Sequence, residues 1–203
     1  RLVNMDSFSE DGEDVNKVGE TVSGWMREAG FHTEKIAKPA IDPDESWMEK
    51  LGNGFSARTH EREAGPGIVF LGHMDTVFPA GTAAARPFRV EGGRAYGPGV
   101  ADMKAGLVAN LVAARALKRL GLVHCPLTPM FSADEGLGSP SASRTLAQVL
   151  PGARAAINSE PGGPGGLVTV SRKGSGHMFL KVQGKASHAG RCYAEGASAI
   201  LEI

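Results

Sequence analysis

The sequence predicts an α/β fold with a largely parallel central sheet and helices on both faces. Two kinds of segment support this prediction: short apolar runs such as residues 67–71, and longer stretches with helical periodicity such as residues 103–120. An apolar run without polar alternation is typical of a strand that is buried on both faces. Strands and helices that follow one another along a chain favour a layered α/β domain.

The first elements are expected to be a helix and a strand. Residues 13–29 carry apolar side chains at helical spacing, and Gly30 follows as a stop signal. Residues 31–36 are expected to form a strand. Residues 37–65 are polar and rich in proline, glycine and charge, so we expect strands with long turns there.

The middle of the chain continues with a strand, a hairpin and a helix. Residues 67–71 form an apolar run bounded by glycine and are predicted to be a buried strand. Residues 88–90 and 94–96 flank a glycine-rich turn, which indicates a small hairpin. Residues 103–120 give the clearest helical pattern, and Asp102 at its start suits the N-terminal helix dipole.

The remaining elements complete the alternation. Residues 127–132 are expected to form a second buried strand, although Pro129 cannot donate a ladder hydrogen bond. Residues 140–150 are expected to form a helix, and residues 153–158 a strand. Weaker patterns predict strands at 167–170 and 177–182 and the start of a helix at 196–203.

The composition narrows the class of protein. The chain has 203 residues, of which 41% are hydrophobic and 22% charged, as in ordinary globular proteins. Lysine plus arginine and aspartate plus glutamate both number 22, so no basic field attracts nucleic acid or an acidic membrane. No apolar run approaches the roughly 20 residues that span a bilayer. We therefore expect neither nucleic-acid nor membrane partners.

The chain opens with Arg1, which we interpret as the loss of an earlier beginning. The lack of a leader sequence then carries no information about the cellular address. We favour a cytoplasmic location and leave a periplasmic or secreted one open.

Four polar motifs follow predicted strands or apolar runs. They are residues 72–77, 97–104, 132–136 and 159–163. An α/β sheet collects its chemistry at the carboxyl ends of its strands, so the polar side chains of these motifs are expected to converge. Imidazole and carboxylate groups gathered in this way indicate a metal site for the hydrolysis of an amide.

Each candidate residue also has a simpler interpretation. His73 and Asp75 are a possible ligand and its orienting carboxylate, or two polar loop residues. Asp102 has two oxygens that suit a bridging ligand, or it caps a helix. Glu135 and Glu160 follow buried runs as a general base and a ligand, or they are surface acids. Each signal is weak alone, and their consistent order favours the metal site.

Together the motifs resemble the zinc-dependent family of glutamate carboxypeptidases (carboxypeptidase G type), acetylornithine deacetylase, succinyl-diaminopimelate desuccinylase and aminoacylase. The similarity runs from residues 2–7 to residues 184–190 and is greatest to the glutamate carboxypeptidase branch. It implies a zinc-exopeptidase-like catalytic domain over residues 1–174, which is incomplete here. It also implies that residues 175–203 begin a small α+β lid and dimerisation domain.

The resemblance implies a role for each motif residue. His73 would be a terminal ligand of one zinc, with Asp75 behind it. Asp102 would bridge two zincs, and Glu160 would complete the site of His73. Glu135 would be the general base that deprotonates the bridging water.

One more histidine and two departures from the family pattern follow. His188 resembles the lid histidine that reaches across a homodimer to polarise the scissile carbonyl. Gly136 stands where the family has a second glutamate, a ligand of the other zinc. The late histidine that binds that zinc has no counterpart before Ile203. We therefore expect one zinc here where the family holds two, and we make no prediction of a dimer for this chain.

The resemblance implies hydrolysis of an amide bond in a small peptide or N-acyl amino acid, with water activated by Glu135. The alternative is a degenerate or partial family member that binds one metal or a partner without efficient catalysis. A third interpretation is a sheet-based binding module without metal. It is supported only if each candidate residue has its simpler role, as a loop residue, a helix cap or a surface acid.

Overall fold

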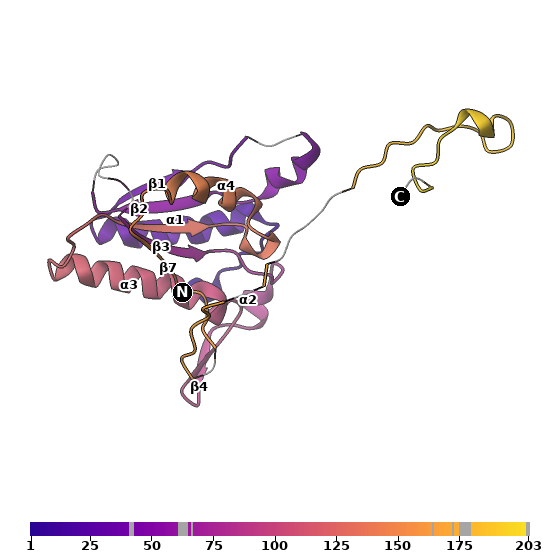
Figure 1. Cartoon of the computed structure of the whole chain (residues 1–203). Coiled ribbons are helices and arrows are strands. Elements are labelled where there is room, and N and C mark those ends of the chain that lie inside the picture. The colour runs from indigo at the N-terminus through magenta and orange to yellow at the C-terminus, as the bar shows by residue number, and fades with distance from the viewer. Residues whose placement is uncertain are drawn as a thin grey trace. The chain divides into compact units, whose positions relative to one another are not determined.

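The structure is a computed structural model. It describes residues 1–40, 43–60, 65, 67–163, 165–171, 173–174 and 180–201 (Figure 1). The chain divides into two compact units, Arg1–Pro161 and Gly162–Ile203. The first unit ends before residue 174, after which the sequence led us to expect a domain boundary. That the second unit begins a lid domain stays a prediction.

The first unit is built on a five-stranded sheet. In spatial order its strands are β1 (His32–Ile36), β2 (Gly54–Arg58), β6 (Leu127–Ser132), β3 (Ile68–His73) and β7 (Ala155–Asn158). β3 pairs in parallel with β6 and β7, whereas β2 pairs antiparallel with β1 and β6. The sheet is therefore mixed, and the prediction of a largely parallel sheet is wrong for its β1–β2 half. After β1 the chain turns back and forms β2 directly beside it, which makes this pair antiparallel. A parallel pair would require a crossover connection.

Helices flank this sheet. They are α1 (Gly12–Glu28), α3 (Ala105–Arg119), α4 (Pro140–Val149) and the short α2 (Thr82–Ala85). α1 and α3 contact each other and share one core with the sheet residues Phe55, Phe70 and Phe131. Met130 and Phe131 are consecutive in β6, so their side chains point to opposite faces of the sheet. Ala142 of α4 lines a small cavity together with Met130, which places α4 on the face opposite α1 and α3. The predicted helices at 13–29, 103–120 and 140–150 are confirmed to within a few residues.

α1 shows how the local sequence defines a helix. The Asp11 side chain accepts a hydrogen bond from the Asp14 amide, which caps the helix start. Gly30 adopts a φ of 78° just past the helix end, a conformation that favours glycine. The buried stripe consists of Val15, Val18, Val22 and Met26. Burying each of these side chains contributes about 1.5–3 kcal/mol.

Two strands expected near the end of the chain do not form in the described residues. Residues 167–170 make only one isolated bridge, between Gly163 and Leu167. Residues 180–182 form no strand, and residues 177–179 of the same predicted strand lie outside the described residues. A strand needs a neighbour for its backbone groups, so weak alternation alone is not sufficient.

The helix expected from residue 196 is also absent from the described residues 196–201. A 3₁₀ turn (Tyr193–Glu195) precedes this segment, and residues 202–203 lie outside the described part. The backbone N–H and C=O of Ala197 pair with Lys185 in an isolated bridge. These groups are therefore not available to start a helix.

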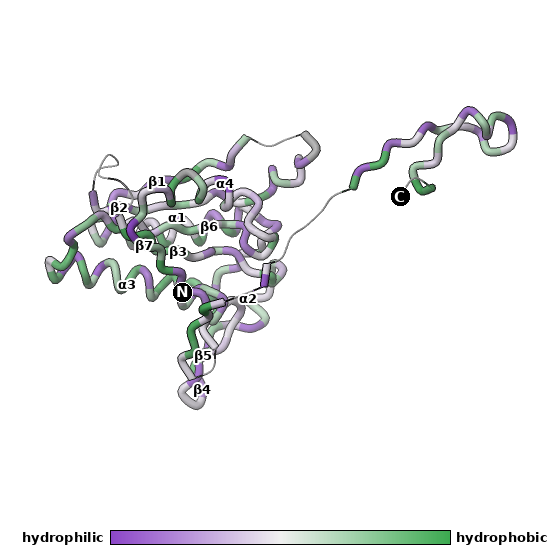
Figure 2. Tube along the Cα trace, in the orientation of Figure 1, coloured by the Kyte–Doolittle hydropathy of each residue, from purple (hydrophilic) through white to green (hydrophobic). Residues whose placement is uncertain are grey.

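The hairpin of β4 (Arg89–Glu91) and β5 (Arg94–Tyr96) forms as expected. Among the described residues, none of the helices is both long and apolar enough to cross a membrane. Figure 2 shows polar and apolar residues interspersed along α3.

Candidate metal centre

The candidate residues lie on segments that meet at the carboxyl end of β3. His73 is the last residue of β3, Glu135 begins a 3₁₀ turn after β6, and Glu160 follows β7. Because β6, β3 and β7 are parallel neighbours, their carboxyl ends share one edge of the sheet. Asp102 comes from a π-helical turn (Val100–Lys104) that leads into α3.

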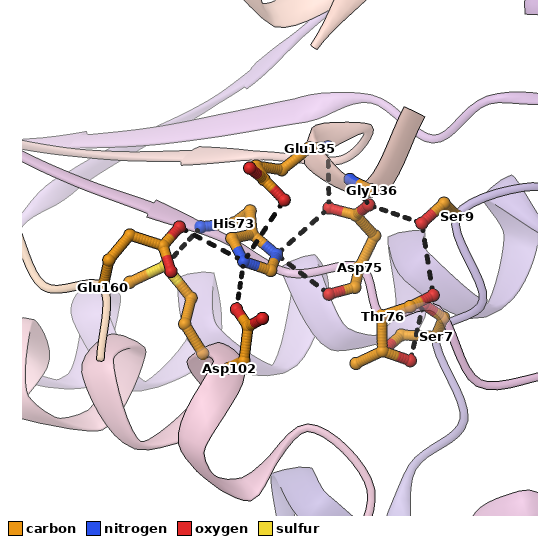
Figure 3. Close-up of polar contacts among 10 residues, drawn as sticks. Ser7, Ser9, His73, Asp75, Thr76, Asp102, Glu135, Gly136 and Glu160 are labelled. Atoms are coloured by element: carbon orange, nitrogen blue, oxygen red, sulfur yellow. Dashed lines mark hydrogen bonds and ion pairs between the residues drawn. The ribbon is translucent and has the colours of Figure 1, made fainter. Parts of the chain in front are cut away.

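The side chains converge on one imidazole nitrogen (Figure 3). His73 Nε2 lies 2.9 Å from Asp102 Oδ1 and 3.3 Å from Glu160 Oε1. The nearest oxygen of Glu135 is 3.8 Å from the same nitrogen. One ligand atom from each of His73, Asp102 and Glu160 lies within 4.8 Å of the others. Such a set of one nitrogen and two oxygens suits a divalent cation such as zinc.

Asp102 does not cap the following helix. Its backbone has φ −116° and ψ 97°, and two residues separate it from the first residue of α3. α3 begins only at Ala105, and no side chain caps its start. The Asp102 side chain is 66% exposed and directs Oδ1 at His73. The simpler interpretation of Asp102 as a helix cap is therefore wrong.

Asp75 contacts the His73 ring at Nδ1, the nitrogen that does not face the candidate ligands. His73 Nδ1 lies 2.9 Å from the Asp75 carbonyl oxygen and 3.4 Å from Asp75 Oδ1. With Nδ1–H donating to Asp75, Nε2 faces the two candidate carboxylate ligands, and in the neutral ring its lone pair would be free to bind a cation placed between them. The side chains of His73 and Asp75 are only 5% and 0% exposed, so these contacts are shielded from water.

The charged groups of the site change one another's pKa values. Burial lowers the pKa of His73, but Asp75, Glu160 and Asp102 together outweigh it and raise that pKa to about 9. Burial raises the pKa of Glu160, and the negative charges of Asp102 and Glu135 add to this shift against the opposing His73. Burial also acts to raise the pKa of Asp75, but the hydrogen bonds from His73, Ser9 and Gly136 lower it overall. Carboxylates crowded in this way favour a bound cation.

The Asp75 carboxylate also connects two other segments to the site. Ser9 Oγ donates to Asp75 Oδ2 at 2.6 Å, and the Gly136 amide donates to the same oxygen at 3.0 Å. The Glu135 amide donates to Asp75 Oδ1 at 3.2 Å. The position of the Glu135 backbone is thus tied to the residue that holds His73.

A buried asparagine that the sequence analysis missed places the Glu160 loop. Asn110 of α3 donates through Nδ2 to the Leu71 carbonyl oxygen at 2.9 Å and accepts from Ser159 Oγ through Oδ1. A Cβ on Gly106 would lie 2.2 Å from the Ser159 carbonyl oxygen, so glycine permits this close approach of α3. An asparagine within the apolar stripe of a helix was the available sequence signal.

Lys104 is a second buried residue that the sequence analysis did not single out. Its Nζ donates to the Met5 carbonyl oxygen at 2.6 Å and links the metal-site turn to the N-terminal segment. Burial lowers the pKa of Lys104 to about 8, against the opposing charge of Asp6.

A cavity of about 250 Å³ opens beside these groups. His73, Asp102 and Glu135 line its polar side, while Val77 and Phe78 contribute apolar surface. A small molecule can therefore reach the carboxylates of Asp102 and Glu135 from this side.

Two further positions singled out by the sequence are Gly136 and His188. Gly136 lines the same cavity but offers no ligand atom. His188 belongs to the second unit, where its Nδ1 accepts a hydrogen bond from the Gly190 amide at 3.1 Å. Its role at the site stays a prediction.

Comparison with known proteins supports this chemistry. The family model of peptidase family M20/M25/M40 matches residues 69–197, well over half of the chain. Carboxypeptidase G2 of Pseudomonas sp. (strain RS-16) is 29% identical over 205 aligned residues, which cover 100% of this chain and 47% of that protein. Succinyl-diaminopimelate desuccinylase of Parvibaculum lavamentivorans is 30% identical over 179 residues, which cover 81% of this chain and 42% of that protein. The chain thus spans less than half the length of these relatives.

The fold has a counterpart among solved structures. Human carnosine dipeptidase 1 superposes with a TM-score of 0.63 at 15% identity, over 79% of this chain and 37% of that chain. At this identity the likeness concerns the fold alone.

Proposed function

Because the chain belongs to peptidase family M20/M25/M40, we propose that it carries a zinc site for the hydrolysis of an amide bond in a peptide or N-acyl amino acid. The observation that supports this proposal is that His73 Nε2 lies 2.9 Å from Asp102 Oδ1 and 3.3 Å from Glu160 Oε1, in a group whose ligand atoms all lie within 4.8 Å of one another. Peptide-type substrates are in keeping with a peptidase family. The finer part of the proposal is that the substrate ends in a residue with a carboxylate side chain, as the substrates of glutamate carboxypeptidases do.

The donor set fits zinc. One imidazole and two carboxylates are three protein ligands, which leave a coordination position open as in catalytic zinc sites. A zinc ion held there would supply a Lewis acid and lower the pKa of water. Asp75 would keep the His73 ring in the tautomer that binds metal.

Glu135 is the proposed general base. Its carboxylate lies 3.8 Å from His73 Nε2, beside the ligands but farther from the imidazole than either of them. Its side chain is 51% exposed, so it lines the cavity from which water and substrate arrive. Glu135 would accept a proton from the attacking water and donate it to the leaving amide nitrogen.

Gly136 favours a second candidate function. The described residues contain one group of three metal-binding side chains, and no ligand atom stands at position 136. If two metals are needed for efficient turnover, this chain binds one metal or a partner without fast catalysis. Single-zinc hydrolases exist, so the donor set alone does not exclude activity.

Metal content tests the site. The purified 203-residue chain, dialysed against trace zinc, is expected to retain one zinc per chain, and His73→Ala to retain none. His32→Ala is the matched control, because His32 is exposed on β1. A wild-type chain without zinc, or a His73→Ala variant that keeps it, would overturn the proposal.

Turnover then separates the two functions. An N-acyl glutamate and a dipeptide serve as substrates for the zinc-loaded wild type and for Glu135→Gln. Hydrolysis by the wild type that falls at least about 100-fold in Glu135→Gln, with zinc retained in both, supports the enzyme. Bound zinc without turnover in either protein supports the non-catalytic function.

A further inference from the structure

The N-terminal segment before α1 runs beside the loop that follows β3. The Thr76 amide donates to the Ser7 carbonyl oxygen at 2.7 Å, and the Ser9 amide donates to the Thr76 carbonyl oxygen at 3.0 Å. Phe8 and Thr76 form an isolated parallel bridge. These backbone bonds define the register between the segment and the loop, and they bring the Ser9 side chain to Asp75 (Figure 3).

Ser9 makes the shortest contact of the Asp75 carboxylate. Its hydroxyl lies 2.6 Å from Asp75 Oδ2 and 3.1 Å from the Thr76 carbonyl oxygen. A hydroxyl has one proton, and the closer, charged oxygen is the stronger acceptor. Ser9 is only 2% exposed, so little water reaches this bond. Without Ser9, the bond that Oδ2 keeps among the described residues is the longer one from the Gly136 amide, at 3.0 Å.

The same hydroxyl occupies the space of a side chain at position 136. A Cβ on Gly136 would lie 2.6 Å from Ser9 Oγ, closer than Cβ atoms approach non-bonded atoms, and 3.4 Å from both Asp75 Oδ2 and Val77 Cγ1. Gly136 is not among the glycines with positive φ, so its backbone conformation does not itself require glycine. A side chain at position 136 would therefore displace the Ser9 hydroxyl from its place beside Asp75.

We propose that Ser9 is a positioning residue of the metal centre, which acts through Asp75 on His73 and whose hydroxyl a side chain at position 136 would displace. Ser9 holds Asp75 Oδ2, and Asp75 in turn holds His73 Nδ1 and the Glu135 amide. This inference rests on the proposed zinc site. Groups that hydrogen-bond to a metal-binding histidine typically change metal affinity about 10–100-fold when they are removed. Ser9 acts one bond farther away, so we expect about tenfold.

The test is a double-mutant cycle on zinc affinity in the 203-residue chain, measured by competition with a chromophoric chelator. Ser9→Ala and Gly136→Ala should each weaken zinc binding about tenfold, because each removes the same hydrogen bond. The double variant should bind zinc no more weakly than either single variant. Ser7→Ala is the matched control, since the buried Ser7 hydroxyl finds no hydrogen-bond partner among the described residues.

A second readout separates positioning from general stability. The visible spectrum of bound cobalt(II), which reports ligand geometry, should change in Ser9→Ala and stay unchanged in Ser7→Ala. Urea unfolding of the metal-free proteins shows whether each variant is folded. If Ser9→Ala does not fold, Gly136→Ala tests the same contact from the other side.

The outcomes distinguish the two proposals. A wild type without zinc overturns the proposed function and this inference with it. A wild type that binds zinc through His73, together with unchanged affinity in Ser9→Ala or Gly136→Ala, overturns this inference alone. Additive losses in the double variant, or an equal loss in Ser7→Ala, overturn it as well.

Discussion

Zinc and a proton compete for the imidazole of His73, so zinc affinity should rise steeply with pH. In the metal-free chain, burial lowers the pKa of His73, but Asp75, Glu160 and Asp102 outweigh it and raise that pKa to about 9. Zinc binds the neutral ring. Because the pKa is raised above its ordinary value of 6.5, the ring is protonated at neutral pH and zinc must displace a proton.

The size of the effect follows from the pKa of about 9. At pH 7 about one ring in 100 is neutral, which costs about 3 kcal/mol of zinc-binding free energy. Between pH 6.5 and pH 8.5 the neutral fraction rises about 80-fold, and the zinc Kd should fall by a similar factor. The same shift stabilises the metal-free fold below pH 6.5, and this contribution is lost as pH rises through about 9.

Two measurements check this prediction. Chelator competition at pH 6.5, 7.5 and 8.5 gives the zinc Kd, after correction for protonation of the chelator. Calorimetry at pH 7 in two buffers of different ionisation enthalpy counts the protons released, for which we expect about one per zinc. His32→Ala, with its exposed ring, should behave like the wild type. A Kd that changes less than about threefold across this range, or binding without proton release, would refute the reasoning.

Two further predictions concern the elements that position the site. Asn110→Ala removes the bonds to the Leu71 carbonyl and the Ser159 hydroxyl and leaves both groups without this partner, so the free energy of unfolding should fall by about 2–3 kcal/mol. Urea denaturation measures it, and a loss below about 0.5 kcal/mol would contradict this role of Asn110. Asp134→Ala removes the side chain that accepts from two amides in the first turn of α4, so we expect a loss of about 1–2 kcal/mol in the same assay. Asp134→Asn, which keeps an acceptor oxygen, should lose less, and an equal loss would argue against the cap.

The sequence alone predicted the three long helices, most strands of the sheet and the residues His73, Asp102 and Glu160 that meet at the candidate site, but not α2. These predictions rest on local signals: apolar periodicity over residues 13–29 and 103–120, and polar residues directly after apolar runs. Such signals are visible because each depends on neighbours a few residues away. They fail near the chain end, where the weak alternation of residues 167–170 has only an isolated bridge as a partner.

Only the tertiary structure decided the mixed sheet order and the network behind His73. The bonds of Asp75 with Ser9, and of Lys104 with Met5, join residues separated by 66 and 99 positions. No local pattern marks a serine or a lysine as the partner of one particular distant group, because the chain fold selects which buried donors and acceptors meet. The contact at Gly136 has the same origin, since the nearest atom to a side chain there would be the distant Ser9 hydroxyl.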